Sequence, residues 1–508
     1  MNLPERSCCI LFAAVLGCIV PAQAEAQFVQ QDGKLVGTGA TGHAGQGYSV
    51  SLSSDGNTAI VGGYLDGGRA GAAWIFARAG GVWSQQGSKL VGTGAVGNAG
   101  QGWSVSISPD GNTAIIGGLT DSSSTGAAWV FTRNGNAWTQ QGSKLVGTGA
   151  AGSAGQGVDV ALSADGNTAI VGGNKDSAGV GAAWIFTRSG NVWSQQGNKL
   201  VGTGAVGHAG QGYSVSLSWD GNTAVIGGFS DDEATGAAWI FTRDGDAWRQ
   251  QGDKIVGSGA TANTRQGYAA SLSSDGNTVA LGAPTDNESE GAAWIFTRSG
   301  DRWTQQGSKL VGTGAVGNAW QGISLALASD GNTVIVGGYM DSSSAGAAWV
   351  FSRNAGIWSQ QGSKLVGTGA QGPAGQGISV SLSSDGTTAV VGGIGDNDTS
   401  GAVWVYTQSG TSIGDRVLKV PEGYCLRQNY PNPFNPSTTI TYELPKSSAV
   451  RLSVYDLLGH EVSVLVNERR DAGVYEAFFD AAGLSSGVYI YRLQAGDFVQ
   501  SRKLILVK

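Results

Sequence analysis

The chain of 508 residues has few charged side chains, few prolines and only three histidines. Asp, Glu, Lys and Arg make up 13% of the sequence, and the formal net charge is −7. This negative balance argues against a general nucleic-acid binder or a binder of anionic membranes. The 10 prolines and 86 glycines follow no triplet period, which excludes collagen. The 16 tryptophans argue against disorder, because such a chain has apolar surface to bury.

Cysteine is absent from most of the chain. Three of the four cysteines lie in the first 18 residues, and only Cys425 lies beyond them. In the same N-terminal stretch, Arg6 precedes an apolar run over 8–20, and the small-residue patterns AQA and AEA follow at 22–26. This order is typical of a secretory signal peptide, which we predict over residues 1–24. The exported chain is then expected to have no internal disulfide, no cysteine metal site and no membrane span.

A repeat of 55 residues dominates the sequence. Seven copies follow one another without insertion or deletion, and each has a tryptophan in a GAAWIF-like segment and an aspartate in an S-x-D-G-N/T segment. The tryptophans are Trp74, Trp129, Trp184, Trp239, Trp294, Trp349 and Trp404. The aspartates are Asp55, Asp110, Asp165, Asp220, Asp275, Asp330 and Asp385. A constant period of this length indicates a repeat architecture.

Each copy predicts four short strands. In the first copy, residues 48–53 alternate apolar and small polar side chains, and an Asp-Gly-Asn turn leads into a second strand over 58–63. Residues 72–76 are continuously apolar, as expected for a strand that is covered on both faces, and a fourth strand is expected over 83–91. Four-stranded units of this length stack as the blades of a propeller.

The phase of the repeat predicts a closed ring. The segment that begins at Phe28 aligns with the fourth strand at Trp83, whereas the seventh copy stops after its third strand near Gln408. A linear solenoid has no use for this offset, but a ring can use the N-terminal strand to complete its last blade. The sequence therefore predicts an all-β fold, in which a seven-bladed β-propeller of four-stranded blades covers residues 27–410.

The repeat resembles the FG-GAP class. The segments GYSVSLS, TAIVGG, GAAWIF and WSQQGSKL carry this resemblance, which covers all seven copies. It implies a propeller like that of integrin α chains and of many bacterial surface proteins. The calcium-binding version of the repeat has several acidic residues in the turn where this chain has one, such as Asp55. Because calcium takes about six to eight oxygen ligands, we predict no metal and no cofactor, and interpret these aspartates as turn formers.

The C-terminal part has a different composition and predicts a second module. Residues 411–423 are expected to be a linker, and residues 424–508 alternate short strands and turns, which predicts a small immunoglobulin-like β-sandwich. The module opens on an NYPNPFNPS motif. The motif residues singled out are Asn429, Tyr430, Pro431, Asn432, Pro433, Phe434, Asn435 and Pro436.

This module resembles the C-terminal sorting domain of the type IX secretion system. The motif and the segments VYDLLGHEV and SSGVYIYRL carry the resemblance. It implies passage through the inner membrane by the signal peptide and outer-membrane export guided by the module. The type IX secretion machinery is therefore an expected partner, and the expected location is secreted or on the outer cell surface.

No catalytic pattern stands out in the sequence, so an enzyme is not predicted. The histidines are His43, His208 and His460, and the first two occupy the same repeat position three blades apart, too far for a shared site. The G-x-G strings recur in every copy without a following helix, so they are not phosphate loops. No distinctive serine motif nominates a nucleophile.

The segments between the second and third strands differ most among the copies. They are expected to share one face of the disc with the connections from the fourth strand to the next first strand. A binding surface and neutral drift are both open interpretations of this variation. Candidate ligand-binding residues in these segments are Tyr64, Arg69, Lys175, Phe229, Asp231, Asp232, Glu233, Asp286, Glu288, Glu290 and Tyr339. The six carboxylates among them are predicted to form a negative patch on blades four and five, which attracts a basic partner or a weakly held cation or only aids solubility.

The sequence favours a secreted or cell-surface binding or adhesion protein that presents this face to a glycan, protein or matrix ligand. A structural surface-layer component is the first alternative, and a propeller-based polysaccharide-degrading enzyme is the second. The fold alone does not decide among these functions.

Overall fold

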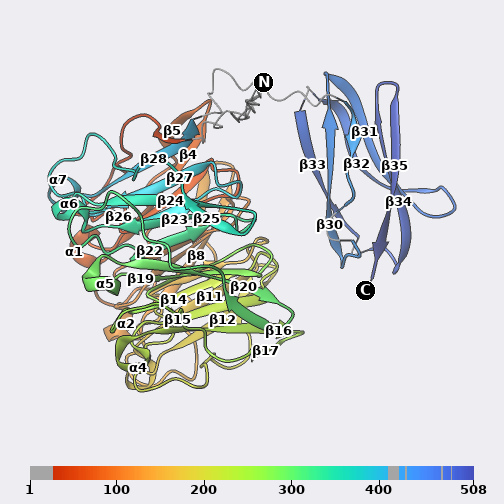
Figure 1. Cartoon of the computed structure of the whole chain (residues 1–508). Coiled ribbons are helices and arrows are strands. Elements are labelled where there is room, and N and C mark those ends of the chain that lie inside the picture. Colours follow the sequence, from red (N-terminus) through yellow and green to blue (C-terminus); the bar gives the residue numbers. More distant parts are fainter. Residues whose placement is uncertain (1–26, 410–422, 430–431, 471–472, 482, 508) are drawn as a thin grey trace, which may run out of the picture. The chain divides into compact units, whose positions relative to one another are not determined.

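The computed structural model describes residues 27–409, 423–429, 432–470, 473–481 and 483–507. The chain divides between Gly410 and Thr411 into two compact units, which are described separately below (Figure 1). The predicted signal peptide and nearly all of the predicted linker lie outside the described residues.

The N-terminal unit consists of seven four-stranded antiparallel sheets, which confirms the predicted seven-bladed propeller (Figure 1). The innermost strands are β2 (Ser49–Leu52), β6 (Ser104–Ile107), β10 (Val160–Leu162), β14 (Ser214–Leu217), β18 (Ala269–Leu272), β22 (Ser324–Leu327) and β26 (Gln376–Leu382). The second strands are β3 (Thr58–Gly63), β7 (Thr113–Gly118), β11 (Thr168–Gly173), β15 (Thr223–Gly228), β19 (Thr278–Ala283), β23 (Thr333–Gly338) and β27 (Thr388–Gly393).

The two outer positions of each blade follow the same order. The third strands are β4 (Ala72–Ala79), β8 (Ala127–Asn134), β12 (Ala182–Ser189), β16 (Ala237–Asp244), β20 (Ala292–Ser299), β24 (Ala347–Asn354) and β28 (Ala402–Ser409). The fourth strands are β5 (Val82–Gln85), β9 (Ala137–Gln140), β13 (Val192–Gln195), β17 (Ala247–Gln250), β21 (Arg302–Gln305), β25 (Ile357–Gln360) and, in the seventh blade, β1 (Gln27–Gln30).

The N-terminal strand closes the ring as predicted. β1 pairs antiparallel with β28, and Phe28 lies opposite Gln408. Just beyond β1, Lys34 forms an ion pair of 2.6 Å with Asp396 of the seventh blade. The closing segment therefore repeats an ion pair that the other six blades form within the continuous chain.

The core lies between neighbouring blades and is organised by the repeated tryptophan. Trp74 is fully buried and packs in one cluster with Val403 and Val405 of the seventh blade. Its indole nitrogen donates to the Thr38 carbonyl at 2.8 Å. A Cβ on Gly37 would lie 2.2 Å from the indole ring, so only glycine fits over this tryptophan. The same contact recurs at the equivalent glycine of all seven blades.

Single helical turns connect the second and third strands. They are α1 (Asp66–Arg69), α2 (Asp121–Ser124), α3 (Asp176–Gly179), α4 (Asp231–Ala234), α5 (Asp286–Ser289), α6 (Asp341–Ser344) and α7 (Asp396–Thr399). Residues inside these turns have positive φ angles, as Ser122 and Ser123 do at +50° and +57°. This left-handed backbone explains why the sequence shows no helical periodicity there.

The C-terminal unit is a sandwich of two sheets around one core, as predicted. One sheet has the order β29 (Cys425–Leu426), β30 (Ser437–Leu444) and β33 (Gly473–Asp480). The other has the order β32 (Glu461–Arg470), β31 (Ser448–Tyr455), β34 (Gly487–Ala495) and β35 (Phe498–Leu506). Fully buried residues from both sheets, such as Ile440 and Leu452, form the shared core.

Candidate functional site

The connections that differ among the blades gather on one face of the propeller. The turns α1, α2 and α4–α7 lie along the same side of the unit in Figure 1. The Thr41 backbone N–H, in the connection that enters blade one, donates to the Asp66 carboxylate at 2.6 Å. The two kinds of connection therefore share a face, as predicted, and we call it the loop face.

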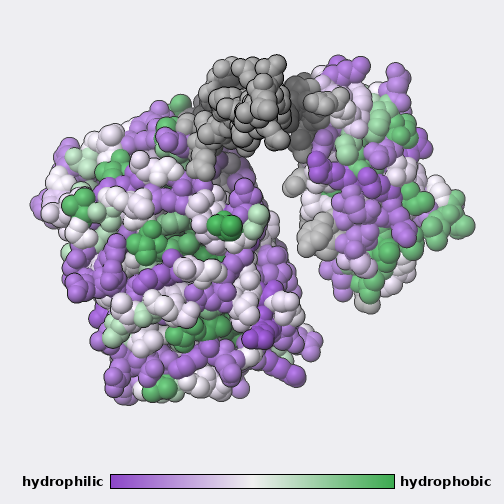
Figure 2. Space-filling view, in the orientation of Figure 1, coloured by the Kyte–Doolittle hydropathy of each residue, from purple (hydrophilic) through white to green (hydrophobic). Residues whose placement is uncertain are grey.

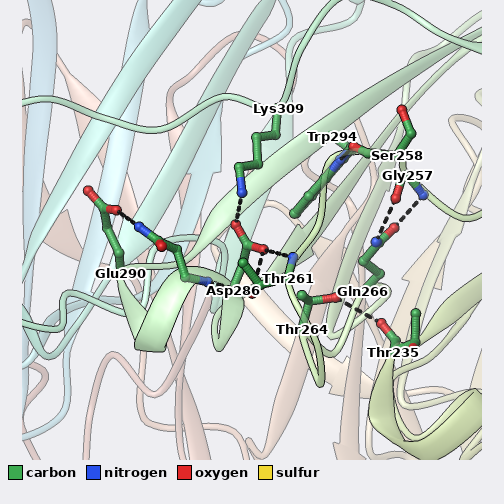
Figure 3. A network of polar contacts seen from close by, with 11 residues as sticks. Thr235, Gly257, Ser258, Thr261, Thr264, Gln266, Asp286, Glu290, Trp294 and Lys309 are labelled. Carbon is green, nitrogen blue, oxygen red and sulfur yellow. Dashed lines mark hydrogen bonds and ion pairs between the residues drawn. The ribbon is translucent and has the colours of Figure 1, made fainter.

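The recurrent aspartate of the loop face is a structural residue. Asp286 is fully buried, pairs with Lys309 at 2.5 Å and accepts a hydrogen bond from the Thr261 backbone at 2.9 Å (Figure 3). The seven equivalent pairs are Asp66–Lys89, Asp121–Lys144, Asp176–Lys199, Asp231–Lys254, Asp286–Lys309, Asp341–Lys364 and Asp396–Lys34. Each carboxylate is at most 3% exposed, so these aspartates are not available to a ligand.

The prediction that Asp231 and Asp286 belong to an exposed acidic patch was therefore wrong. A lysine on the following segment neutralises each of them inside the protein. The sequence did contain a signal, because a lysine follows the aspartate after 23 residues in six of the seven copies.

Four of the six predicted carboxylates remain accessible on blades four and five. Asp232, Glu233 and Glu288 are exposed at turn positions, and Glu290 is partly exposed. The Glu290 carboxylate accepts a hydrogen bond from the Asn287 side chain at 2.5 Å (Figure 3). An open hollow of about 690 Å³ beside them is lined by Ala234, Thr261, Ala262, Asn263, Arg265, Thr285, Asn287 and Glu288. Because Arg265 enters this hollow, the patch is less negative than the sequence suggested.

The two predicted basic residues stand apart from this hollow. Arg69 is exposed on α1, and Lys175 is exposed just before α3. Lys175 lines a different hollow of about 730 Å³ over blade three. The structure therefore brings neither of them to the acidic residues.

A channel of about 260 Å³ runs between the innermost strands, and three layers of side chains line it. The layer at the loop face is Tyr48, Trp103, Val158, Tyr213, Tyr268, Ile323 and Ile378. The middle layer is Ser49, Ser104, Asp159, Ser214, Ala269, Ser324 and Ser379. The far layer is apolar and includes Val50 and Leu325. Each layer takes one side chain from equivalent positions of successive repeats.

Aromatic side chains gather around the mouth of this channel. Tyr48, Tyr64 and Trp103 form one cluster with ring centroids 4.6–4.8 Å apart. Tyr213, Phe229 and Tyr268 form a second cluster at 4.5–5.5 Å. Trp320 and Tyr339 form a pair at 5.7 Å. We call these eight partly exposed residues the aromatic rim.

The rim contains three predicted residues and five that sequence reasoning missed. Tyr64, Phe229 and Tyr339 come from the variable connections that the sequence nominated. The missed residues are Tyr48, Trp103, Tyr213, Tyr268 and Trp320. Four of them directly precede the innermost strands β2, β6, β14 and β18, at a repeat position where other copies have Val158, Ile323 and Ile378, so variation at that position was the available signal.

Tyr48, Tyr213 and Tyr339 of the rim stay neutral and can both donate and accept hydrogen bonds. Burial raises the pKa of Tyr48 and Tyr213, and their proximity to Tyr268 raises both pKa values further. Burial and Tyr268 likewise raise the pKa of Tyr339. Tyr213 also shares a hydrogen bond with Tyr268. Tyr268 of blade five therefore interacts electrostatically with tyrosines from blades one, four and six.

Asp159 is the one carboxyl group among the residues that line the channel. It accepts hydrogen bonds from the backbone N–H groups of Val215 at 2.7 Å and Val160 at 3.0 Å. Burial raises its pKa to about 7, although these two hydrogen bonds oppose the rise. Five other blades have serine here, and Ser49 donates to the carbonyl of Gly102 in the next blade at 2.9 Å. Blade three thus replaces a structural hydroxyl with an ionisable group.

The turn aspartates of the opposite hairpins are structural, in line with their interpretation as turn formers. The Asp55 carboxylate accepts hydrogen bonds from the Ser53 hydroxyl and from the backbone and side chain of Asn57. Burial opposes ionisation of Asp55, but these hydrogen bonds lower its pKa overall. Within the described parts of the chain, no group of three or more His, Cys, Asp or Glu side chains is placed to hold a metal ion.

The NYPNPFNPS motif of the C-terminal unit is built into the sandwich. Asn429 is buried, and its backbone N–H donates to the Tyr491 hydroxyl at 2.8 Å. Asn432 accepts from the Ile505 backbone at 2.8 Å, and the buried Phe434 bridges in parallel to Leu506. The motif therefore fastens the last strand β35. Its members Pro433, Asn435 and Pro436 are exposed, whereas Tyr430 and Pro431 lie outside the described residues.

A comparison with known protein families identifies the C-terminal unit. Residues 428–508 match the family of secretion system C-terminal sorting domains. The C-terminal unit is a sorting domain. The sorting domain indicates export by the type IX secretion system to the cell surface or the medium, and it implies contact with that machinery. In the described residues, no helix is long and apolar enough to cross a membrane. The FG-GAP assignment of the repeats stays a prediction.

Several solved structures are similar to this chain at low sequence identity. Hydrazine synthase of Kuenenia stuttgartiensis is 11% identical over 74% of this chain and 100% of that chain, with a TM-score of 0.47. A GH74 xyloglucanase of Xanthomonas campestris is 12% identical over 82% and 59%, with a TM-score of 0.44. The β-propeller domain of the Trilobed protease from Pyrococcus furiosus, which has an open velcro topology, is 10% identical over 71% and 96%, with a TM-score of 0.39. Among curated proteins, no relative matches the sequence.

Proposed function

We propose that this chain is an exported binding protein whose propeller holds an extracellular ligand at the aromatic rim. One observation carries the proposal: aromatic side chains collect at the mouth of the channel, at positions where the repeats differ. The buried tryptophan, its glycine and the aspartate–lysine pair are the same in every blade. Residues that serve the fold have no reason to differ between equivalent blades, so the variation at the rim is best explained by a ligand.

The rim also has the composition of a binding surface. Tyrosine and tryptophan offer large rigid faces together with hydrogen-bonding groups, and they are enriched at binding sites. The propeller surface seen in Figure 2 mixes hydrophilic and intermediate residues with several apolar patches. A concave site in which aromatic walls surround a few polar groups is the usual form of a ligand site.

A hydrolase would need more than this site supplies. Glycoside hydrolysis generally uses two carboxyl groups on either side of the scissile bond. Among the described channel-lining residues Asp159 has no carboxyl partner, and His43 and His208 are exposed on outer loops. We therefore favour binding over catalysis.

The proposal is tested by probing the purified full-length chain against arrays of glycans and of extracellular-matrix proteins. We expect capture of at least one class of ligand. The matched control replaces Tyr213 with Val and Phe229 with Leu. Other blades have these residues at the same repeat positions, as Val158 and Leu119. Failure to bind any array, together with assembly of the purified chain into ordered sheets, would favour the structural surface-layer alternative instead.

A further inference from the structure

Two aromatic clusters flank a gap in the rim, and the channel carboxyl lies at that gap. The Tyr48–Tyr64–Trp103 cluster belongs to blades one and two. The Tyr213–Phe229–Tyr268 cluster belongs to blades four and five. Blade three lies between them and contributes the aliphatic Val158 and, directly after it, Asp159. An apolar wall therefore stands on each side of the channel's one carboxyl group.

We infer that the ligand is a saccharide whose terminal sugar ring lies in this gap, between the two aromatic clusters and within reach of Asp159. This inference rests on the proposed function and specifies its ligand. A sugar ring has apolar C–H faces that pack against aromatic rings, while its hydroxyl groups need hydrogen-bond partners. The rim and the channel supply both, because Tyr48 and Tyr213 keep their hydroxyl protons and the Asp159 carboxyl group belongs to the channel lining.

The size of the channel limits how much of the ligand enters. Its volume of about 260 Å³ lies below the roughly 300–1,000 Å³ of pockets that enclose drug-sized ligands. One terminal sugar ring is therefore the unit that the channel mouth accommodates, and the rest of the chain must lie over the loop face.

The ring geometry favours a sugar over an organic cation. An aromatic cage for an ammonium group turns several ring faces towards one point. Here the rings meet each other at interplanar angles of 58–65° within the two clusters. The guanidinium of Arg265 already lies 6.0 Å from the Phe229 ring. Because the ring centroids within each cluster lie only 4.5–5.5 Å apart, the rings pack against one another and leave no space for an ammonium group between them.

Two positions of the loop face are held in unfavourable backbone conformations. Arg265 and Trp320 have φ angles of +60° and +59°, at a repeat position where the other five copies have glycine. A bulky residue in this left-handed region costs about 1–2 kcal/mol and occurs mainly where function requires it. The fold alone prefers glycine there, so the presence of Trp320 beside Tyr339 supports recruitment of aromatic surface to the rim.

The inference is tested on an array of linear oligosaccharides that differ in their terminal sugar, with saturation-transfer NMR to locate the bound ring. The full-length chain is compared with the variants Tyr48→Ile, Tyr213→Val and Asp159→Ser, each of which takes a residue found in another blade. We expect Tyr48→Ile and Tyr213→Val to keep the parental melting temperature, Asp159→Ser to melt at or above it, and each of the three to bind the captured sugar about tenfold more weakly. A control variant, Asp232→Ser with Glu233→Ser, should bind as the parent does.

The outcomes separate this inference from the proposed function. Capture of a sugar that all three variants bind with parental affinity would overturn the inference and leave a binding function elsewhere on the propeller. Capture of proteins but of no oligosaccharide would overturn it as well. Absence of binding to glycans and to proteins would instead overturn the proposed function itself.

Discussion

The framework of the blades, meaning the residues common to all seven copies, differs from the aromatic rim in how strictly it follows the repeat. In the framework, Trp74, Gly37 and the Asp66–Lys89 pair recur in all seven blades, and each makes the same contacts in every copy. In the rim, some blades have an aromatic residue where others have an aliphatic one at the same repeat position, as Tyr48 and Ile323 show. The comparison shows that residues repeated in every blade stabilise the propeller, whereas residues that differ among equivalent blades form the candidate site.

The largest expected effect comes from opening the ring. Deleting residues 28–37 removes most of β1 and Lys34, which exposes the edge of β28 and leaves Asp396 buried without its cation. We expect the melting temperature to fall by roughly 10 °C or more, with aggregation in size-exclusion chromatography. Removal of residues 424–508 serves as the control and should leave the propeller transition unchanged. A monomer with parental melting after the first deletion would contradict the closure.

The next effect separates two neighbouring aspartates of blade four. Asp231 is fully buried against Lys254, whereas Asp232 is exposed. Replacing Asp231 with Ala should destabilise the propeller by about 3–5 kcal/mol, because it removes the carboxylate that neutralises Lys254. The same change at Asp232 should leave the free energy of unfolding, measured in urea titrations, within about 0.5 kcal/mol of the parent value. Equal destabilisation by the two substitutions would mean that Asp231 is exposed like Asp232 and not paired inside the protein.

A third effect depends on pH and concerns Asp159. Its pKa is raised by burial from 3.8 to about 7, so the folded chain keeps a proton that the unfolded chain releases. The stability that this proton contributes is complete below pH 3.8 and is lost as pH rises through 7. The neighbouring titratable group is Tyr213, which stays neutral in this range. Asp159→Ser should therefore gain up to about 4 kcal/mol over the parent at pH 8, and less towards pH 4, in denaturant titrations. A gain that does not change with pH would contradict this account.

A smaller effect on stability is expected at Trp320, a residue of the aromatic rim. Trp320 occupies a left-handed position that five other blades give to glycine. Trp320→Gly should stabilise the propeller by about 1 kcal/mol, because it relieves the backbone, and it should weaken ligand binding. Gly375→Trp, the reverse change in the next blade, is the matched comparison and should be destabilising. A loss of stability in Trp320→Gly would show that Trp320 stabilises the propeller and would contradict its assignment to the binding surface.

The sequence was most informative where the period is strict. Trp74 and its six equivalents, together with the offset between Phe28 and Gln408, were enough to predict the blades and their closure. The NYPNPFNPS motif was enough to identify the sorting domain.

The candidate site could be predicted only in part, for two physical reasons. Asp231 looked exposed because its partner Lys254 follows it by 23 residues, and only the fold brings the two together. Tyr48 and Tyr213 looked like ordinary members of strands, because a first strand faces a central channel only once seven blades surround it. Their meeting with Tyr64 and Phe229 required the three-dimensional structure.

The most direct test of the central claim is one variant in which Tyr48, Tyr213 and Tyr268 are all replaced by Ile, as at Ile323 and Ile378. Its thermal unfolding and its binding to the ligand captured by the parent chain are measured on the same preparation. We predict an unfolding transition within a few degrees of the parent, because these side chains are partly exposed and lie outside the buried core, and a loss of binding. The central claim is that the repeated residues stabilise the propeller and the variable rim residues bind the ligand. Parental binding by this variant, or a large loss of its stability, would contradict that claim.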